Sequence, residues 1–528
     1  MRDVQPGSPL PTLASGIPGL DHVTGGGLPQ GEVTLLAGTT GTGKSVMAAQ
    51  FLVSGVTDAA QAGVFVTTEE RPEKIRRVLG TLGWDVRAWE AQGRWAFVDA
   101  SAGAHPETVL GDELDLSPLI TRIGRAVERI GAKRVVIDSL SHLFARLGDR
   151  PSVRAELHRL IGSLEDLDVT AIVTVERDHE YDGVGRFGVE EFVADNILIL
   201  RNVFENERRR RTIEPLKFRG TPHRCGEFPF VILADRGVAI VALSELQLAY
   251  SAPEERLSFS NPGIDAMLGG GPLRGSAILV SGPTGTGKSL LGLEFLAGAG
   301  EGERGLLVNF EESGEQVARN ARHWGYDLDA LQSAGRLRVM CQYPESTPIA
   351  NHLVAIQHAL DEFRPTRVVV DSLSAVERGA SPRAFFEFLL GLSTLLKAHS
   401  TTGLFTTTTQ SLLGGPSATG VEASTLLDTI VLLRYVEVYG ELRKGIAVLK
   451  MRGSNHERII REFIITDHGA DIGEPFRTTT GILAGTPLEL IGPEKERVEA
   501  LFTGSPSRTG PDHLEMDLTT PAEGWRNP

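Results

Sequence analysis

Cysteine is scarce in this chain of 528 residues, which contains only Cys225 and Cys341. Two cysteines are too few for a disulfide framework or for a zinc site built from thiolates. Long apolar runs are lacking as well, since no stretch of the sequence approaches the 18 consecutive apolar residues of a membrane-spanning helix. Residues 1–7 do not form the apolar core of a signal peptide. We therefore expect a water-soluble protein of the cytoplasm that does not contact a membrane.

Positive charge is also in short supply. Lys and Arg number 53 against 68 for Asp and Glu, which gives a net charge of -15. A protein whose main task is to coat nucleic acid has the opposite excess, so nucleic acid is not an expected partner. The run Arg208–Arg211 is basic, but such runs are more often solvated faces or networks of ion pairs. The remaining composition, 41% hydrophobic and 23% charged, is that of a folded globular protein.

The sequence contains an internal repeat. The motif Pro-Gly-Leu-Asp at residues 18–21 returns 244 residues later as Pro-Gly-Ile-Asp at residues 262–265. Farther along, the Val-Val-Ile-Asp-Ser-Leu motif at residues 135–140 returns after 233 residues as Val-Val-Val-Asp-Ser-Leu. The shorter spacing means that the second copy lacks about one surface loop. Repeats of this length indicate a duplicated domain.

The repeat predicts two tandem domains of the same fold. We expect the first at residues 1–250 and the second at residues 251–490. Residues 491–528 are rich in proline, have little periodicity and are expected to form a flexible tail. Within this tail, residues 494–502 form a short amphipathic segment to which the sequence assigns no use.

Continuous apolar runs mark the expected strands of the first domain. They cover residues 33–37, 63–67, 134–137 and 170–175. Runs without polar alternation are typical of parallel strands that are buried on both faces. Helical periodicity follows the first run after a glycine-rich turn. Alternating strands and helices predict an α/β fold with a doubly wound, mostly parallel sheet in each domain.

Both domains contain the pattern Gly-x-x-x-x-Gly-Lys-Ser directly after an expected strand. The glycines let successive backbone N–H groups turn inward around phosphate oxygens, while the lysine reaches the β- and γ-phosphates and the serine binds Mg²⁺. One copy could arise by chance in a glycine-rich chain, but two copies in the same context exclude coincidence. The expected ATP-binding residues are Gly38, Thr39, Thr40, Gly41, Thr42, Gly43, Lys44, Ser45, Gly282, Pro283, Thr284, Gly285, Thr286, Gly287, Lys288 and Ser289.

Each phosphate loop has an aspartate that can complete a magnesium site. Asp138 and Asp371 end apolar strands, where a carboxylate can hold the magnesium shell opposite Ser45 or Ser289. The alternative is an aspartate that only caps the following loop. The order of the motifs and their repetition favour the metal role.

Two pairs of adjacent glutamates follow the next buried strand. Glu69 and Glu70 in the first domain match Glu311 and Glu312 in the second, at the edge where doubly wound sheets place their ligands. One carboxylate of each pair can orient or deprotonate the attacking nucleophile. The alternative is surface charge that complements a helix N-terminus. Their position after the same strand in both copies favours a catalytic role.

Basic residues at alternate positions recur as Lys217 and Arg219 and as Lys450 and Arg452. In a strand these pairs would share one face. They could be a solvated edge strand, or cations delivered to a γ-phosphate as an arginine finger is. The sequence does not say whether that phosphate belongs to the same chain or to a neighbouring one.

Taken together, these residues resemble the KaiC family, the ATPases and autokinases of the cyanobacterial circadian clock. Residues 185–193 are similar to the first KaiC domain, and residues 426–437 with the following Lys-Met-Arg-Gly-Ser are similar to the second. The resemblance covers about residues 10 to 480. It implies two tandem RecA-like P-loop domains and a two-tier homohexamer, with ATP and Mg²⁺ bound between subunits.

The resemblance also implies phosphorylation sites. In the family, the second domain phosphorylates an adjacent Ser-Thr pair, which corresponds here to Ser424 and Thr425, with Thr419 upstream. Their hydroxyls could replace water as the nucleophile, with Glu311 as the base. Without the resemblance, such a pair would be interpreted as part of an ordinary turn or helix cap. The first domain has Gly-Val-Glu-Glu-Phe at residues 188–192 instead, so we expect hydrolysis there without self-phosphorylation.

The tail after about residue 486 departs from the family's C-terminal segment, which recruits KaiA, so a KaiA-type partner is not expected. A KaiB-like or other signalling protein is a possible partner.

The leading interpretation is an ATPase and serine/threonine autokinase in circadian or stress-type signalling. One alternative is a RecA- or RadA-like DNA-dependent ATPase of recombination or repair, which the acidic charge and the full duplication disfavour. The other is a regulatory scaffold that turns over little ATP, which the intact glutamate pairs disfavour.

Overall fold

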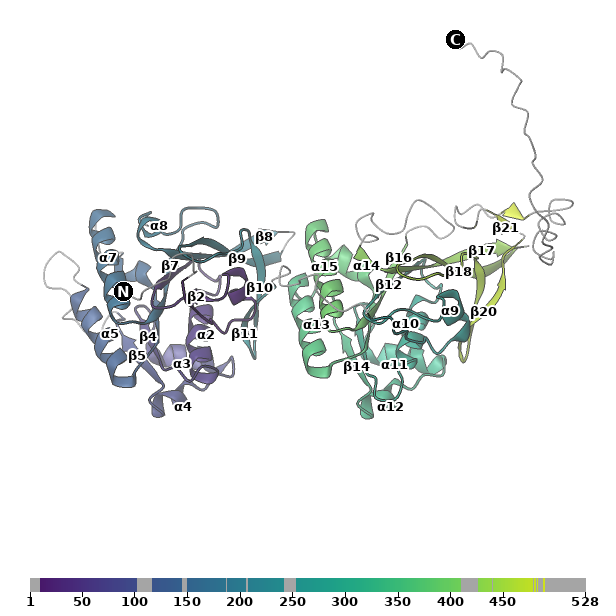
Figure 1. The fold of residues 1–528 in the computed structure, drawn as a ribbon, viewed down its shortest axis with the longest axis horizontal. Coiled ribbons are helices and arrows are strands. Elements are labelled where there is room, and N and C mark those ends of the chain that lie inside the picture. Colours follow the sequence, from purple (N-terminus) through teal and green to yellow (C-terminus); the bar gives the residue numbers. More distant parts are fainter. Residues whose placement is uncertain are drawn as a thin grey trace, which may run out of the picture.

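The computed structural model describes residues 10–101, 116–144, 150–186, 188–205, 208–241, 253–409, 426–438, 440–477, 479–480, 482 and 488–489. Two α/β halves lie next to each other along the long axis of the molecule, the first in purple to blue and the second in teal to yellow (Figure 1). Each half is built around one nine-stranded sheet with helices beside it. The expected pair of α/β domains in tandem is confirmed.

The first half begins with a two-stranded sheet and continues into the nine-stranded one. Its strands are β1 (Thr12–Leu13), β2 (Leu28–Pro29), β3 (Val33–Gly38), β4 (Gly63–Thr67), β5 (Trp95–Asp99), β6 (Arg134–Asp138), β7 (Thr170–Glu176), β8 (Asn196–Glu205), β9 (Arg208–Phe218), β10 (Phe228–Leu233) and β11 (Gly237–Ile240). Its helices are α1 (Leu20–Val23), α2 (Lys44–Thr57), α3 (Pro72–Gly80), α4 (Val86–Ala91), α5 (Ser117–Ile130), α6 (Leu140–Phe144), α7 (Arg150–Asp166) and α8 (Glu190–Val193).

The second half repeats this order. Its strands are β12 (Ala277–Gly282), β13 (Gly305–Asn309), β14 (Leu337–Cys341), β15 (Arg367–Asp371), β16 (Thr402–Thr408), β17 (Thr429–Val438), β18 (Glu441–Met451), β19 (Arg461–Thr466), β20 (Gly469–Pro475), β21 (Thr479–Thr480) and β22 (Leu488–Glu489). Its helices are α9 (Pro262–Met267), α10 (Lys288–Ala297), α11 (Gly314–His323), α12 (Leu328–Ser333), α13 (Ile349–Phe363), α14 (Leu373–Arg378) and α15 (Pro382–Ala398).

The two large sheets have the same topology. The first has the order β11-β10-β9-β8-β3-β7-β6-β4-β5, and the second has the matching order β20-β19-β18-β17-β12-β16-β15-β13-β14. The stretch β8-β3-β7-β6-β4-β5 of the first sheet is parallel, and so is the stretch β17-β12-β16-β15-β13-β14 of the second. The remaining strands of each sheet pair antiparallel. The parallel part places the ends of β3, β4, β6 and β7 at one edge.

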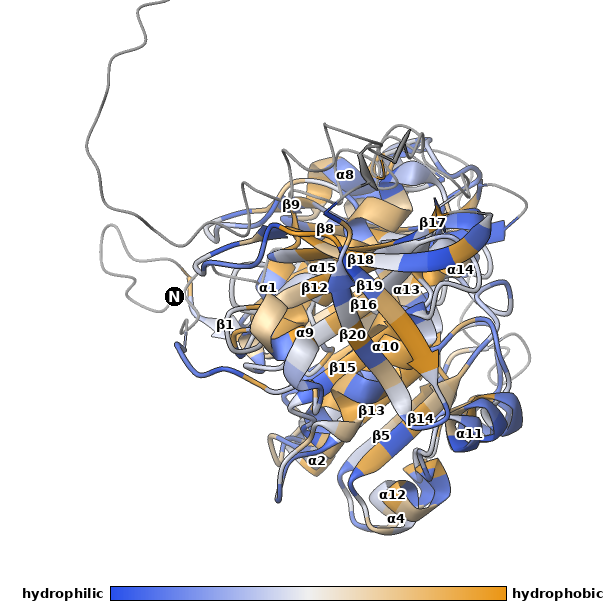
Figure 2. Cartoon of the chain, turned by 90° about the vertical axis from the view of Figure 1, so that its right-hand side faces the viewer, coloured by the Kyte–Doolittle hydropathy of each residue, from blue (hydrophilic) through white to orange (hydrophobic). Residues whose placement is uncertain are grey.

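The central strands are buried on both faces, as the apolar runs predict. In β3, Leu35 packs into the cluster formed with α5 and α7, whereas Leu36 packs into the cluster around α2 on the other face. Successive side chains of a strand point to opposite faces, so an uninterrupted apolar run fits a sheet with helices on both sides. Figure 2 shows orange in central elements of the second half, such as β15 and α10.

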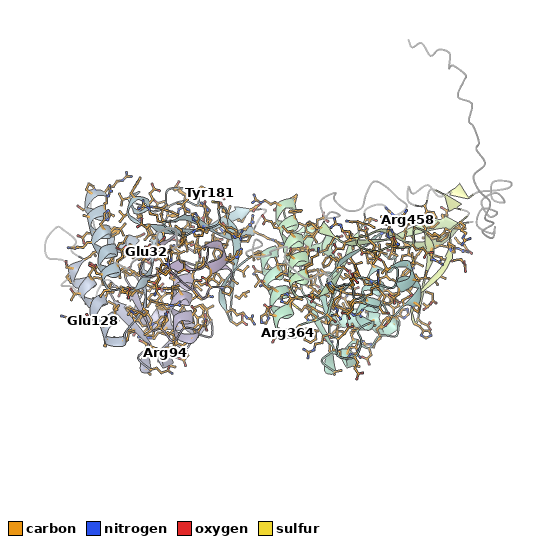
Figure 3. The ribbon with its side chains drawn as sticks, viewed as in Figure 1. Glu32, Arg94, Glu128, Tyr181, Arg364 and Arg458 are labelled. Carbon is orange, nitrogen blue, oxygen red and sulfur yellow. The ribbon has the colours of Figure 1, made fainter. Side chains whose placement is uncertain are left out.

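Charged side chains lie on the outside of both halves, and Glu128, Arg364 and Arg458 are exposed examples (Figure 3). None of the helices in the described ranges is long and apolar enough to cross a membrane.

The two halves contact each other directly. Strands β8 to β11 of the first half face helices α13 and α15 of the second (Figure 1). Val241, which follows β11, packs against the apolar core of the second half. Arg210 at the start of β9 forms an ion pair of 3.0 Å with Glu387 on α15. Apolar packing and this ion pair therefore join the halves.

Candidate nucleotide-binding and catalytic sites

The phosphate loop of each half connects the central strand to the following helix. It runs from the end of β3 into α2 in the first half and from β12 into α10 in the second. Gly43 and Gly287 precede these helices with φ angles of 106° and 102°. A Cβ atom at Gly43 would lie 2.7 Å from the Cδ1 atom of Ile232, so both the backbone conformation and the space require glycine there.

The lysine of each loop is buried and bound to loop carbonyls. The Nζ atom of Lys44 donates to the carbonyl oxygens of Gly38 and Thr39 at 2.9 and 3.0 Å, and Lys288 makes the same two bonds in the second half. Burial lowers the pKa of both lysines, and neighbouring carboxylates oppose that shift. A buried ammonium whose hydrogen bonds go to loop carbonyls suits an anionic ligand such as a triphosphate.

The strand-ending aspartates lie beside these loops. Asp138 accepts a hydrogen bond of 2.5 Å from Thr174, and Asp371 accepts hydrogen bonds from Ser289 and Thr406. Burial raises the pKa of Asp371, and these hydroxyl groups together with the nearby lysine oppose the rise. The contact between Ser289 and Asp371 brings together the two residue types that the sequence assigns to Mg²⁺.

These residues fit a magnesium ion that is bound together with a nucleotide. Ser289, Asp371, Asn309 and Glu312 line one cavity of about 70 Å³ in the second half, and their oxygens are hard ligands. Within the described ranges, no cluster of three or more His, Cys, Asp and Glu side chains could hold a metal alone. Mg²⁺ usually takes one or two carboxylates and completes its shell with water and phosphate oxygens, which matches this set. Ser45 and Asp138 are the corresponding residues of the first half.

The glutamate pair of the second half is held by the turn after β13. The side-chain oxygen of Asn309 accepts hydrogen bonds from the backbone N–H groups of Glu311 and Glu312 at 2.9 and 2.6 Å. The Glu311 carboxylate accepts a hydrogen bond of 2.8 Å from Ser372 and lies 3.6 Å from Arg378. Glu311 therefore faces the residues that follow the aspartate strand.

The pair of the first half follows β4 and is held differently, because Thr67 stands in place of Asn309 and donates to the carbonyl oxygen of Glu70 at 2.5 Å. Glu69 lies 3.9 Å from the Nδ1 atom of His142, whereas Glu70 forms an exposed ion pair with Lys74 on α3. Burial raises the pKa of Glu69, the charge of Glu176 adds to the rise, and His142 opposes it. In the first half Glu69 thus faces His142 and Glu70 faces its own helix, whereas in the second half Glu312 also lines the cavity with Ser289 and Asp371.

The basic pairs lie against the chain segments before β8 and β17. Lys217 donates to the carbonyl oxygen of Ala194 at 2.6 Å, and Arg219 forms an ion pair of 2.7 Å with Asp195. Arg219 lies beyond the end of β9, just as Arg452 lies beyond the end of β18. Each strand therefore ends between the two members of its pair, with the lysine inside the strand and the arginine just beyond it.

Both pairs are remote from the phosphate loop of their own half. Lys217 lies opposite Ile197 in β8, and Ile197 lies opposite Leu35, which is three residues before Gly38. Three residues of strand span about 10 Å. Lys450 is placed in the same way relative to β12. The pairs are therefore near the edge of the sheet opposite the loops, which favours a role toward a neighbouring chain.

The expected phosphorylation sites Ser424 and Thr425, with Thr419, lie outside the described residues. The described chain resumes at Leu426, immediately before β17. The amphipathic segment 494–502 also lies outside the described residues.

Some site residues were missed by the sequence analysis. Glu176 ends β7, the strand next to the phosphate-loop strand, and its charge acts on Lys44. Glu180 accepts a hydrogen bond of 2.6 Å from Thr39 of the loop. The strand-end rule that identified Asp138 would also have found Glu176. His142 gave no such signal, because only the fold brings it to Glu69.

Comparisons with known proteins agree with this arrangement. A family model described as "ATPase: KaiC" matches residues 13–245 and 260–476, which lie in the two halves. The chain is 50% identical to circadian clock protein KaiC3 of Synechocystis sp. over 491 residues, covering 93% of this chain and 97% of that protein. It is 45% identical to the circadian clock oscillator protein KaiC of Thermostichus vulcanus, covering 94% and 95% of the two chains, and 42% identical to that of Synechococcus elongatus, covering 92% and 94%. These matches do not favour the RecA- or RadA-like alternative.

Proposed function

This chain belongs to the KaiC family of ATPases, and we propose that each half binds and hydrolyses Mg-ATP and that the second half also phosphorylates its own chain. The observation that carries the proposal is one arrangement present in both halves. It consists of a buried P-loop lysine, an aspartate that ends β6 or β15, and a glutamate that follows the adjacent strand, β4 or β13, at the same edge.

In the proposed binding step, the loop N–H groups and Lys44 or Lys288 hold the triphosphate at the helix N-terminus. Ser45 with Asp138, and Ser289 with Asp371, would hold Mg²⁺. When bound, Mg²⁺ supplies positive charge to the β- and γ-phosphate oxygens. The lysine carbonyl bonds seen here would be exchanged for bonds to phosphate oxygens, so the ammonium stays buried without losing its partners.

In the proposed chemical step, Glu69 or Glu311 orients the nucleophile and accepts its proton. The nucleophile oxygen forms a bond to the γ-phosphorus, and the bond from that phosphorus to the β,γ-bridging oxygen breaks. The products are ADP and either phosphate or a phosphorylated side chain. This reaction needs positioning and charge stabilisation more than covalent help, which matches a site built from carboxylates and cations.

The charge that develops on the γ-phosphate would be stabilised by a neighbouring chain. Lys217 with Arg219, and Lys450 with Arg452, are placed away from their own loops and close to the surface, as an arginine finger acting on another subunit requires. This supports a homo-oligomer with ATP between subunits, and the family resemblance makes it a hexamer. The relatives are named circadian clock proteins. We accordingly assign this chain to circadian or stress-type signalling with a KaiB-like or other signalling partner.

Intact-mass analysis of the full chain after incubation with Mg-ATP tests the autokinase activity. We expect phosphate on Ser424 and Thr425, none in a Lys288→Ala variant and undiminished labelling in a Lys44→Ala variant. A Lys288→Ala chain that still gains phosphate contradicts the assignment to the second half. Hydrolysis without any mass gain leaves an ATPase alone. Salt-dependent stimulation of hydrolysis by single-stranded DNA would restore the DNA-dependent alternative.

A further inference from the structure

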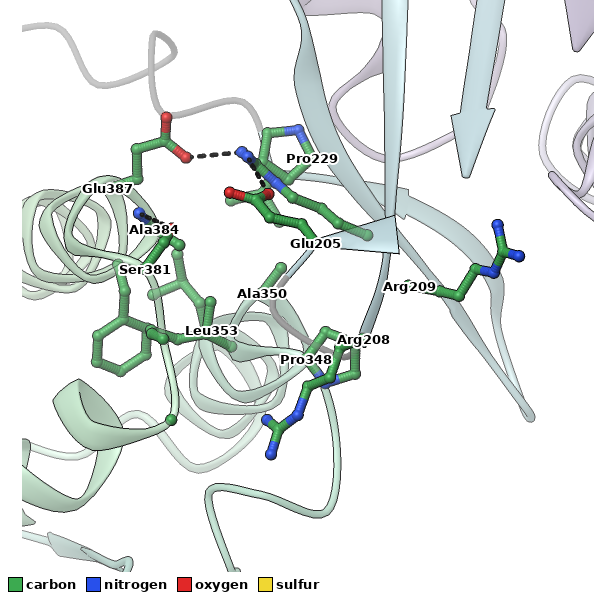
Figure 4. Close-up of a pocket in the computed structure, with 16 residues that line it drawn as sticks. Glu205, Arg208, Arg209, Pro229, Pro348, Ala350, Leu353, Ser381, Ala384 and Glu387 are labelled. Atoms are coloured by element: carbon green, nitrogen blue, oxygen red, sulfur yellow. Dashed lines mark hydrogen bonds and ion pairs between the residues drawn. The ribbon is translucent and has the colours of Figure 1, made fainter. Parts of the chain in front are cut away.

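A cavity of about 90 Å³ lies between the two halves, outside both nucleotide sites. It is lined by residues at the ends of β8 to β11 from the first half and by α13, α15 and the connection between α14 and α15 from the second (Figure 4). A single buried water needs roughly 10–15 Å³ of such space, so this cavity has room for several groups of that size. Clefts between domains are where small-molecule sites are most often found.

Most of the cavity wall is apolar. Its apolar side chains include Pro229 and Val241 from the first half and Ile349, Leu353, Ala384 and Phe388 from the second. Phe388 belongs to the apolar core of the second half, and Val241 packs against it. This wall is therefore continuous with the apolar interior of the second half. A ligand that fills it must present carbon to these side chains.

The charged groups at one rim of the cavity neutralise one another. Arg210 lies 3.6 Å from Glu205 and 3.0 Å from Glu387 (Figure 4). Glu387 is also 3.0 Å from Arg383. Two guanidinium groups thus balance two carboxylates in one connected network. This rim has no formal charge left for a ligand.

Arg208 is different. No ion pair or hydrogen bond joins its guanidinium to another residue in the part of the chain that the structure describes. The group lies near the start of the second half's α14–α15 connection, since a Cβ atom at Gly379 would be 3.9 Å from its Nη1 atom. Its charge also reaches His352, whose pKa burial lowers and Arg208 lowers further. Among the described residues, no carboxylate therefore pairs with this positive charge at the cavity.

The next residue provides a natural comparison. Arg209 points to the other side of β9, away from the cavity (Figure 4), where it donates to the carbonyl oxygen of Asn202 at 2.8 Å and stacks on Phe204. Alternation along the strand sends successive side chains in opposite directions. Arg209 is also among the residues that line the cavity, but its guanidinium points away from it, so Arg208 is the better placed of the two to reach a ligand there.

We propose that this cavity binds a small carboxylate with a short apolar chain or ring, with the carboxylate on Arg208 and the carbon atoms against Val241, Leu353 and Phe388. The planar guanidinium matches a carboxylate with two parallel hydrogen bonds. Because the wall comes from both halves, such a ligand stabilises their present contact. It thereby acts on the relative position of the two ATP-binding halves rather than on either site.

Ligand-observed NMR titration of the full-length chain tests the proposal with three probes. Hexanoate has both the apolar chain and the carboxylate, hexan-1-ol has only the chain, and acetate has only the charge. We expect saturable binding of hexanoate, roughly tenfold or more tighter than that of either comparison compound. Arg208→Gln is expected to lower hexanoate affinity by roughly tenfold or more, and the matched Arg209→Gln variant is expected to leave it unchanged.

A second variant guards against loss of folding in the arginine variants. Ala384→Phe fills the cavity from α15 and leaves Arg208 in place, so it is expected to abolish hexanoate binding while circular dichroism stays that of the parent chain. The proposal is overturned if hexanoate does not bind, if hexan-1-ol binds equally well, or if Arg208→Gln and Arg209→Gln have the same effect.

Discussion

Gln50 and Glu294 stand at the same position of the P-loop helix in the two halves, and each holds the last strand of its own sheet. Gln50 donates to the carbonyl oxygen of Val238 at 3.0 Å and accepts from its N–H group at 2.6 Å. Glu294 accepts a hydrogen bond of 2.5 Å from the N–H group of Ala470. Burial raises the pKa of Glu294 to about 7, and Asp471 adds to the rise. An amide and a titratable acid therefore do the same structural work in the two halves.

The second half is predicted to lose stability as the pH rises from 4.5 to about 7. An unfolded glutamate titrates near 4.5, whereas folded Glu294 retains its proton up to about 7, so the folded state binds the extra proton in this window. The proton on Glu294 stabilises the folded state fully below pH 4.5, and this stabilisation is lost as the pH rises through the folded pKa. The free energy of unfolding falls by about 3 kcal/mol across the window. Glu294→Gln should remove this loss, as measured by urea unfolding of the full chain across the window.

The first half supplies the control for this prediction. Gln50→Glu places the acid where the amide now stands, and it should introduce the same pH-dependent loss into the first half. Unfolding transitions with an identical pH slope in the parent and in Glu294→Gln would show that the proton on Glu294 does not contribute.

Glu311 is predicted to be the base of the second half, with Glu312 in a supporting role. Glu311→Gln should slow phosphoryl transfer by about 10²–10⁴, the range for loss of a positioned base. Glu312→Gln should cost less, because the Glu312 carboxylate is held by Asn320 at 3.1 Å. Phosphate release and phosphate incorporation are measured in chains that all contain Glu69→Gln, so that only the activity of the second half is observed. A larger effect from Glu312→Gln would reverse the assignment.

His142 is predicted to keep Glu69 ionised at lower pH. Protonated Glu69 cannot act as a base, and the histidine lowers its pKa against the effect of burial. In His142→Ala the pKa of Glu69 rises further, so the acidic limb of the hydrolysis profile should move to higher pH. The profile is measured in a Lys288→Ala background to isolate the first half.

The second half provides the matching control for His142, since Ala375 stands at the corresponding position. With first-half binding removed by Lys44→Ala, His142→Ala should leave the pH profile of the remaining hydrolysis unchanged. The prediction is contradicted if His142→Ala shifts the pH profile in the Lys44→Ala background. It is also contradicted if His142→Ala leaves the profile in the Lys288→Ala background unchanged.

Arg219 is predicted to act on ATP bound to a neighbouring chain. Chains with Lys44→Ala and chains with Arg219→Ala should each lack first-half hydrolysis, because each lacks one part of every site. A mixture should regain part of it, since the intact loop of one chain can meet the intact arginine of the other. Both chains contain Glu311→Gln so that only the first half is measured. A mixture as inactive as its components would indicate action within one chain.

Much of the fold could be predicted from the sequence because the central strands are buried on both faces. The apolar run at residues 33–37 predicts β3 almost to the residue, and the run at residues 170–175 predicts β7. The antiparallel strand β9 was not predicted, since the mixed polar and apolar residues of Arg208–Phe218 have no continuous apolar run. Burial on one face leaves a weaker pattern than burial on two.

The candidate sites were predictable where chemistry imposes local spacing. Lys44 and Lys288 follow from the loop pattern alone, and Asp138 follows from its place at a strand end. The contact between His142 and Glu69 depends on how two strands and a short helix meet, which no local pattern contains. The position of Lys217 relative to Gly38 depends on strand register, so only the structure shows that they lie apart.

The central claim is that each half holds its own ATP through its buried loop lysine, and nucleotide stoichiometry tests it most directly. Nucleotide released from the purified full chain after equilibration with Mg-ATP should amount to two molecules per chain. Lys44→Ala and Lys288→Ala should each retain one, and the double variant should retain none. Two molecules retained by either single variant, or no nucleotide bound by the parent chain, would contradict the account.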